Sequence, residues 1–150
     1  MNCESVVKKA LITGIAGQDG SCLAELLLAK GYEVHGIVRR IAIEDTDHKL
    51  KNLRNILDQI NLHVASLDNV LSMIKIVKGL QPDECYHLAA SNFVSYTFED
   101  EISILNNNVN STYYLLAAIR KSVFLAIFIS DFDFRRSRRS AVISATLMPV

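Results

Sequence analysis

The feature that most constrains the fold of this chain is a glycine triplet with a spacing of three: Gly14, Gly17 and Gly20. It follows the β-branched run Val7–Thr13, which predicts a strand, and precedes the helix-forming run Leu23–Lys30. A glycine at a strand end permits a tight turn, a second lets a ligand approach the backbone, and a third permits close helix–strand packing. The unpaired amides at the start of such a helix favour an anion such as pyrophosphate. The triplet therefore predicts a dinucleotide-binding turn, and the alternative is an ordinary flexible loop.

Strand and helix patterns alternate beyond this turn. Further strands are predicted at Tyr32–Val38, Leu62–Ala65 and Glu84–Ala89, and further helices at Glu44–Ile60, Asn69–Leu80 and Asp100–Lys121. Gly31 suits the left-handed position after the first helix, and Pro82 marks the end of the third. Strands separated by helices of this length need right-handed crossovers and hence a parallel sheet covered on both faces. We expect an α/β, doubly wound, Rossmann-like sheet with strand order 3-2-1-4 and with Val123–Ser130 as a candidate fifth strand.

Three of the predicted helices carry an apolar face. In Asn69–Leu80 this face consists of Val70, Ile74 and Val77. In Glu44–Ile60 this face consists of Leu50, Leu53, Leu57 and Ile60. In Asp100–Lys121 it consists of Leu105, Val109, Thr112 and Leu116.

Arg39 and Arg40 follow the second predicted strand directly, and the first acidic residue after them is Glu44. In a dinucleotide-binding unit this point meets the adenosine ribose, where an acidic residue bonds the 2′-hydroxyl of NAD and an arginine accommodates the 2′-phosphate of NADP. A charge-assisted hydrogen bond is worth about 1.5–3 kcal/mol, so one arginine is enough to set the preference. The pair therefore predicts NADP as the cofactor, and the alternative is two solvated surface arginines.

Composition argues against several other classes of protein. Half of the 150 residues are hydrophobic and 16 basic residues balance 16 acidic ones, so neither disorder nor a nucleic-acid partner is expected. The start shows no signal-peptide pattern, and the apolar run VFLAIFI is much shorter than the roughly 20 residues of a membrane helix. The three cysteines form no C-x-x-C pair and the four histidines lack ligand spacing, so neither a metal nor a disulfide framework is expected. We expect a cytoplasmic domain with no membrane contact.

Four segments of the chain are more specific than the general pattern: TGIAGQDGS, LAELLLAKGYEVHGIVRR, PDECYHLAA and LLAAIR. Together they resemble the extended short-chain dehydrogenase/reductases and, within them, the GDP-mannose 4,6-dehydratase family, over about residues 8–121. The resemblance implies a lyase that binds NADP in an amino-terminal Rossmann domain, oxidises the sugar at C4, eliminates water across C5 and C6, and returns the hydride to C6. It also implies GDP-mannose, a nucleotide sugar, as the substrate and a homo-oligomer for the full-length protein.

The resemblance assigns cofactor-binding roles by position. At the pyrophosphate it implies Gly14, Ile15, Ala16, Gly17, Gln18, Asp19 and Gly20. It implies Arg39 and Arg40 at the 2′-phosphate, Leu67 and Asp68 beside the adenine, and Leu88, Ala89, Ala90 and Ser91 along the ribose and nicotinamide. The chain departs from the family where Ala65 and Ser66 stand for the usual Gly-Asp, where Ser91 and Asn92 stand for Gln-Ser, and where Ser103 stands for tyrosine. These departures leave open a relative that acts on a related nucleotide sugar.

The catalytic Tyr-x-x-x-Lys pair of the superfamily is not found in the chain, so no catalytic residue is assigned. The residues four places after its five tyrosines are Gly36, Ala90, Asp100, Ala117 and Ala118. From residue 122 onward the sequence has no Gly, Lys, Glu, Asn, Gln, His or Tyr. We therefore expect an incomplete NADP-binding domain over residues 1–121 and an atypical tail over residues 122–150 from a frameshifted or otherwise truncated reading frame.

This chain alone is expected to be inactive. Two alternatives to a dehydratase remain open from the sequence. One is another NADP-dependent nucleotide-sugar epimerase or reductase, and the other is a non-catalytic nucleotide-binding remnant.

Overall fold

The computed structural model describes residues 7–90, 98–121 and 127–130, and of these it describes residues 98–103 and 127–130 by their backbone alone. At its centre is a parallel sheet in the order β3-β2-β1-β4-β5. The strands are β1 (Lys9–Thr13), β2 (Glu33–Val38), β3 (Asn61–Val64), β4 (Glu84–His87) and β5 (Ile127–Ser130). The predicted α/β class and the order 3-2-1-4 are confirmed. The candidate fifth strand forms over the last four residues of Val123–Ser130, beside β4.

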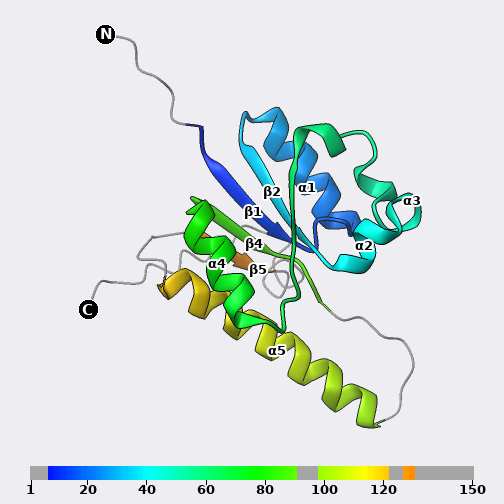
Figure 1. The fold of residues 1–150 in the computed structure, drawn as a ribbon, viewed down its shortest axis with the longest axis vertical. Helices are drawn as coiled ribbons and strands as arrows, with labels where there is room; N and C mark the ends of the chain where they lie inside the picture. Colours follow the sequence, from blue (N-terminus) through cyan, green and yellow to red (C-terminus); the bar gives the residue numbers. More distant parts are fainter. Residues whose placement is uncertain (1–6, 91–97, 122–126, 131–150) are drawn as a thin grey trace, which may run out of the picture.

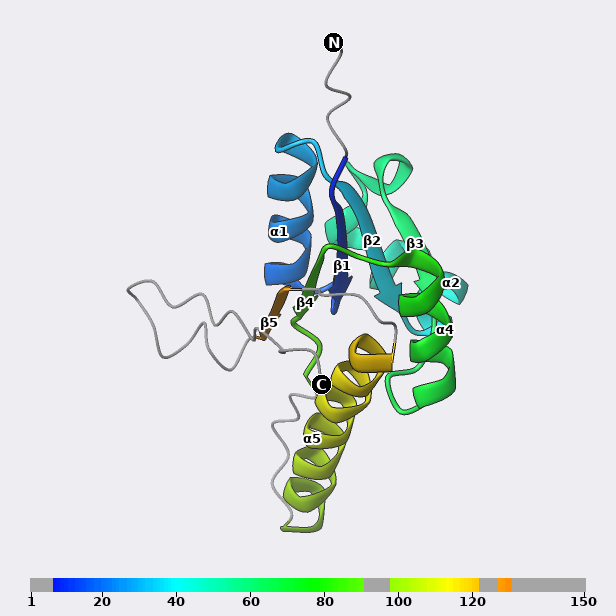
Figure 2. The ribbon, with the colours of Figure 1, turned by 90° about the vertical axis from the view of Figure 1, so that its left-hand side faces the viewer.

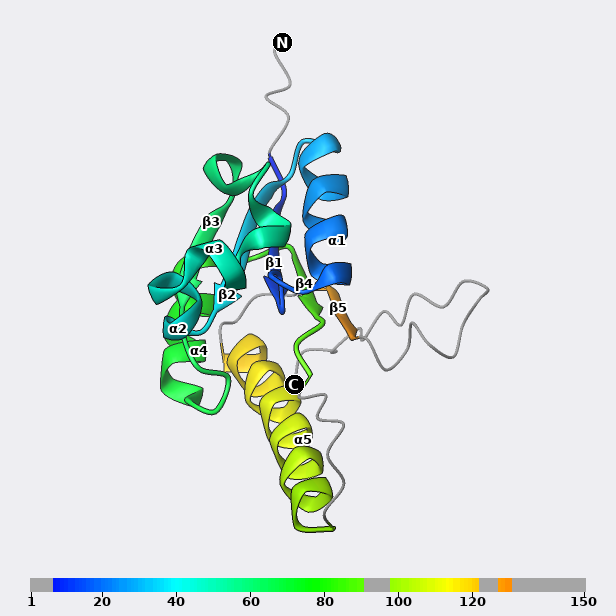
Figure 3. The same ribbon diagram turned by 90° about the vertical axis from the view of Figure 1, so that its right-hand side faces the viewer.

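Helices cover both faces of the sheet, as the two side views show (Figures 2 and 3). α1 (Gln18–Ala29) lies on one face, and α4 (Val70–Leu80) and α5 (Phe98–Lys121) lie on the other (Figure 1). Successive side chains of a strand point to opposite faces, and β1 shows the consequence. Ala10 and Ile12 belong to the core that includes α1, whereas Leu11 belongs to the core that includes α4 and α5.

The ends of two helices agree with the residues that predicted them. Gly31, after α1, has a φ of 79°, and its N–H donates to the carbonyl of Leu28 at 2.9 Å. The N–H of Tyr32 donates to the carbonyl of Leu27 at 3.0 Å, so two of the last carbonyls of α1 are satisfied. After α4, Gln81 adopts the left-handed conformation and Pro82 follows, at the predicted exit.

The prediction of one helix over Glu44–Ile60 is wrong. A short helix, α2 (Arg40–Glu44), ends where the predicted helix should begin. One more short helix and two 3₁₀ turns follow it: α3 (Thr46–Lys49), η1 (Lys51–Leu53) and η2 (Leu57–Gln59). The amides of Leu53, Ile56 and Gln59 each donate to the carbonyl three residues earlier, so the buried side chains are three residues apart from Leu50 to Ile56. The buried positions are Leu50, Leu53, Ile56 and Ile60, and the predicted core residue Leu57 is exposed.

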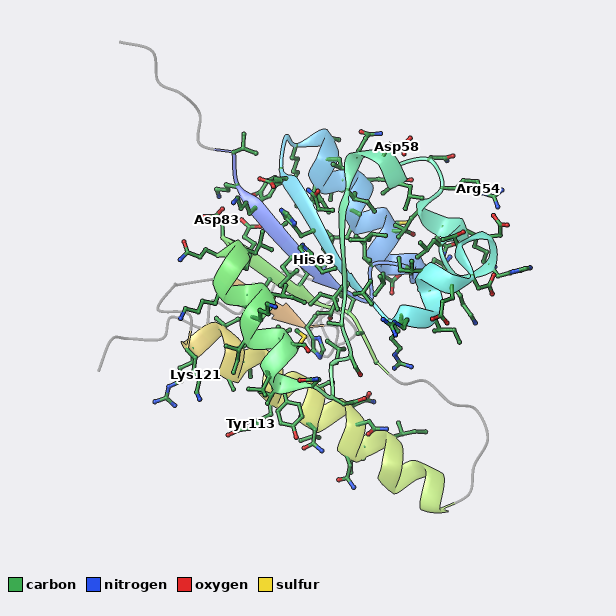
Figure 4. The ribbon with its side chains drawn as sticks, in the orientation of Figure 1. Arg54, Asp58, His63, Asp83, Tyr113 and Lys121 are labelled. Carbon is green, nitrogen blue, oxygen red and sulfur yellow. The ribbon has the colours of Figure 1, made fainter. Side chains whose placement is uncertain are left out.

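The apolar face predicted for α5 is also wrong. Leu105, Val109 and Leu116 are exposed, as is Tyr113, which Figure 4 labels on α5. The helix instead buries Ser111, Leu115, Ala118 and Ile119. Both sets repeat at helical spacing, and the buried set contains the smaller side chains, which allow a helix to approach its neighbours more closely.

Two further findings apply to residues 7–90, 98–121 and 127–130. No helix in this part of the chain combines the length and apolar character that crossing a membrane requires. No group of three or more His, Cys, Asp or Glu side chains is arranged there to hold a metal ion.

Candidate cofactor-binding site

A cavity of about 550 Å³ opens at the carboxyl ends of the strands. It is lined by Gly14 and Ala16 after β1, Ile37–Arg39 at the end of β2, Ala65–Asp68 after β3, and Ala89 and Ala90 after β4. The connection from β1 leads to β2 on one side, whereas the connection from β3 leads to β4 on the other side of β1, so the strand order reverses at this point. Ligands of open α/β sheets bind at such switch points, and the volume is typical of a cofactor pocket.

The turn after β1 requires glycine at its first position. Gly14 has a φ of 75°, and a Cβ there would lie 2.7 Å from the amide nitrogen of Ala89, where the chain leaves β4. The third glycine, Gly20, lies in the first turn of α1, where a Cβ would lie 2.8 Å from the Cα of Ile15. The triplet therefore brings three segments together: the end of β1, the exit from β4 and the start of α1.

No side chain caps the start of α1. Gly17 is its N-cap residue and makes no side-chain capping bond, and its own N–H donates to the carbonyl of Gly14 at 2.9 Å. The first amides of an α-helix have no acceptor within the helix, and they carry the positive end of its dipole. A Cβ on Gly17 would meet only the Gly14 carbonyl oxygen, at 3.2 Å. The residues present therefore fit a pyrophosphate at this turn.

The structure brings about half of the predicted cofactor residues to the cavity. Those that line it are Gly14, Ala16, Arg39, Leu67, Asp68, Ala89 and Ala90. Gly17, Gln18 and Asp19 are exposed at the start of α1, beside the glycine turn, and Gly20 is buried there.

The other predicted residues do not line the cavity. The side chain of Ile15 is buried, and a Cβ on Gly36 of β2 would lie 2.5 Å from its Cγ2 atom. Leu88 packs against the same core as Ile15. Arg40 is exposed as the first residue of α2 but is not among the lining residues, and Ser91 lies outside the described residues.

Several lining residues were missed by sequence reasoning. Ile41, Ala42 and Lys49 come from α2 and α3, and Asn107, Asn108 and Ser111 come from α5. Their positions depend on how these helices dock at the sheet edge, and no local sequence signal distinguishes them. Ser66, which stood in the sequence only as a departure from the family, also lines the cavity, and its hydroxyl donates to the carboxylate of Asp68 at 3.1 Å.

Hydrogen bonds of His87, on β4, connect the end of β1 to α5. The Thr112 hydroxyl of α5 donates to the carbonyl of Asn108 at 2.9 Å, so its oxygen accepts from Nε2–H of His87 at 3.1 Å. Nδ1 of His87 then accepts from the hydroxyl of Thr13 at 2.7 Å, and that hydroxyl oxygen accepts from the N–H of Ala89 at 3.4 Å. Burial lowers the pKa of His87 to about 4, which keeps the ring neutral, as this arrangement requires.

The chain is similar to known proteins over most of its length. The profile of the family described as GDP-mannose 4,6 dehydratase matches residues 11–130. The GDP-mannose 4,6-dehydratase of Yersinia enterocolitica is 44% identical over 117 residues, which is 76% of this chain and 32% of that protein. The GDP-mannose 4,6 dehydratase of Homo sapiens is 47% identical over 94 residues, which is 60% of this chain and 25% of that protein. The chain thus spans a third or less of the length of these two curated relatives.

A solved structure shares the fold at lower identity. The UDP-glucose 4-epimerase of Brucella ovis in complex with NAD has a TM-score of 0.64 and 25% identity, over 81% of this chain and 35% of that one. The family profile begins within β1 and ends with β5, and it contains the glycine turn, both arginines and every segment that lines the cavity. The resemblance predicted from four sequence segments is therefore confirmed, and the chain belongs to the GDP-mannose 4,6 dehydratase family.

Proposed function

We propose that this chain is the NADP-binding part of an enzyme that converts GDP-mannose to GDP-4-keto-6-deoxymannose. The observation that carries the proposal is a cavity at the switch point of the sheet, in a chain whose relatives at 44% and 47% identity are named GDP-mannose 4,6-dehydratases. When bound, the cofactor supplies hydride transfer to and from the sugar. The role of the chain is to bind and orient that cofactor.

The proposed contacts divide the cofactor among the strand ends. The start of α1 holds the pyrophosphate, and Arg39 binds the 2′-phosphate. Leu67 and Asp68 lie beside the adenine, and the segment Leu88–Ser91 follows the ribose and nicotinamide. The lining of the cavity by Arg39, Asp68 and Ala89 supports this orientation.

NADP is proposed over NAD because a cation, rather than a carboxylate, follows β2 and lines the cavity. The double variant Arg39→Ala/Arg40→Ala is expected to lose the preference for NADP⁺ over NAD⁺, a change of at least about tenfold in the ratio of dissociation constants. Weak binding through the glycine turn is expected to remain. Calorimetric titration of both cofactors measures the ratio, and equal affinities in the unsubstituted chain would refute the assignment.

The epimerase alternative has less support. The UDP-glucose 4-epimerase of Brucella ovis is 25% identical to this chain, against 44% for the Yersinia dehydratase. An epimerase and a dehydratase share the cofactor-binding fold, so the fold alone does not separate them. The higher identity favours the dehydratase.

The 150-residue chain by itself is expected not to dehydrate GDP-mannose. Neither Tyr32 nor Tyr86 has the environment of a general base, because the hydroxyl of each donates to the Glu84 carboxylate, at 3.0 and 2.6 Å. The bond to Glu84 raises the pKa of Tyr32, and burial together with the same carboxylate raises the pKa of Tyr86. A tyrosinate base needs the opposite shift, which a neighbouring ammonium four residues away supplies in the superfamily.

The measurement is an assay of the purified chain with GDP-mannose and NADP⁺, in which the full-length Yersinia relative is the positive control. No 4-keto sugar is expected above the blank. Product formation by this chain alone would show that another of its side chains acts as the base.

The boundary proposed at residue 121 stays a prediction. The family profile continues to residue 130, across the backbone of β5, which pairs with β4 from Glu84↔Ile127 to His87↔Ser130.

A further inference from the structure

Two cationic side chains line the cavity from different elements. Arg39 is the N-cap residue of α2 and Lys49 is the last residue of α3, and Figure 1 shows these two short helices side by side beyond the end of β2. Arg40 does not line the cavity. Among the described residues neither Arg39 nor Lys49 makes an ion pair with a carboxylate. Of the described lining residues, the other charged one is Asp68, whose carboxylate accepts from Ser66.

The backbone that carries Lys49 is anchored on both the core and the glycine turn. Leu50, the next residue, is 3% exposed and belongs to the core that includes α1. Nδ2 of Asn52 donates to the carbonyl of Ala16 at 3.0 Å, across 36 positions of sequence. Ala16 itself lines the cavity. The segment that carries Lys49 is therefore held against the wall of the cavity. The long side chain of Lys49 lets its ammonium group reach into the cavity.

We propose that Arg39 and Lys49 together hold the 2′-phosphate, and that Lys49, rather than Arg40, is the second residue that determines specificity. The assignment rests on the proposed binding of NADP. The residue after the second strand meets the adenosine ribose, so the 2′-phosphate belongs beside Arg39. A phosphate monoester carries between one and two negative charges at neutral pH, roughly −1.5 to −2, and one arginine does not neutralise it.

Arginine and lysine make complementary contacts with such a group. The guanidinium binds two phosphate oxygens in its plane, and the ammonium adds a compact charge from another direction. NAD has an uncharged 2′-hydroxyl at this position, so the second cation strengthens the binding of NADP and changes that of NAD little. Asp68 lines the same cavity, and its carboxylate repels the 2′-phosphate. This repulsion makes the second cation more important.

The test compares dissociation constants of NADP⁺ and NAD⁺ for the full 150-residue chain and for Lys49→Ala, Arg40→Ala and Lys51→Ala. Lys51 is the matched control, since it is an exposed lysine two residues further on that does not line the cavity. Lys49→Ala is expected to reduce the preference for NADP⁺ about tenfold. Arg40→Ala and Lys51→Ala are expected to change it by less than about twofold, as exposed charges usually do. Lys49→Arg is expected to retain most of the preference.

The possible outcomes distinguish a wrong role for Lys49 from a wrong cofactor. An unsubstituted chain without a preference for NADP⁺ contradicts the cofactor itself. A clear preference that survives Lys49→Ala but falls in Arg40→Ala overturns the role of Lys49 and leaves the cofactor in place. A second readout on the same variants is how much more strongly 2′-AMP than 5′-AMP competes with NADP⁺ for binding. Lys49→Gln replaces Lys49→Ala if circular dichroism shows that the alanine variant is unfolded.

Discussion

Gly14→Ala is expected to destabilise the domain by about 3 kcal/mol or more, whereas Gly31→Ala costs about 1 kcal/mol. The two glycines have nearly the same backbone conformation, with φ values of 75° and 79°. A Cβ on Gly31 has nothing within 4 Å, so its variant suffers only the strain of a left-handed residue. A Cβ on Gly14 would also lie 2.7 Å from the nitrogen of Ala89 and 2.8 Å from the carbonyl carbon of Leu88, two backbone atoms that move only with the chain.

Urea unfolding of both variants measures the difference, with the slope of the transition as a check that the same structure unfolds. Gly14→Ala is also expected to weaken cofactor binding, because it displaces Ala89, which lines the cavity. Gly31 lies at the carboxyl end of α1, away from the lining residues, so its variant should bind as the unsubstituted chain does. Equal losses of stability in the two variants would mean that the exit from β4 does not lie against the glycine turn.

The free energy of unfolding is expected to fall by about 3 kcal/mol through His87 alone as the pH drops from about 6.5 to about 4. His87 has an ordinary pKa near 6.5 in the unfolded chain and a pKa of about 4 in the folded one, because it is buried. Between these values the unfolded chain binds more protons than the folded chain, so stability falls as the pH falls. Above about pH 6.5 both states are neutral at this site and the contribution is constant.

A proton on Nδ1 would also displace the hydroxyl hydrogen that Thr13 donates to that atom. His87→Asn removes the titration, so its stability should depend less steeply on pH than that of the unsubstituted chain, even though its stability at pH 7 is lower. His48→Asn is the control, because the His48 side chain is 83% exposed.

His35 and His63 also make the folded chain less stable as the pH falls. Their effect is common to His87→Asn and the unsubstituted chain. They lie on β2 and β3, and Nδ1 of His35 is 3.0 Å from Nε2 of His63, which Figure 4 labels. Burial lowers the pKa of both. Their contribution is present in each variant, so the difference between His87→Asn and the unsubstituted chain reports His87. Parallel pH profiles for these two proteins would contradict the buried, neutral state of His87.

The helix ends that carry a local signal were predictable. Gly31 and Pro82 have backbone requirements that hold in any tertiary context, and both mark the helix ends as expected. The strand order followed from the alternation of strands and helices, since right-handed crossovers leave few arrangements of a parallel sheet. The glycine turn and Arg39 were also predictable, because the residues that follow parallel strands meet at one edge of the sheet.

The segment after Arg40 was not predictable, because its apolar residues fit either an α-helical face with Leu57 or a series of 3₁₀ turns with Ile56. The folded chain adopts the 3₁₀ turns, which bury Ile56 and expose Leu57. In α5 two apolar stripes compete, and only docking against α4 and the sheet decides that Leu115 is buried and Leu105 is exposed.

By itself, the sequence determined the class of the fold, the order of its strands and the glycine turn, because each depends on local backbone geometry or on chain connectivity. Tertiary structure alone decided which helical residues complete the cavity. Lys49 and Asn108 line it because α3 and α5 pack at the carboxyl edge of the sheet. The contacts of these helices join parts of the chain that are far apart in sequence. A local sequence pattern does not contain the packing energy that favours these contacts.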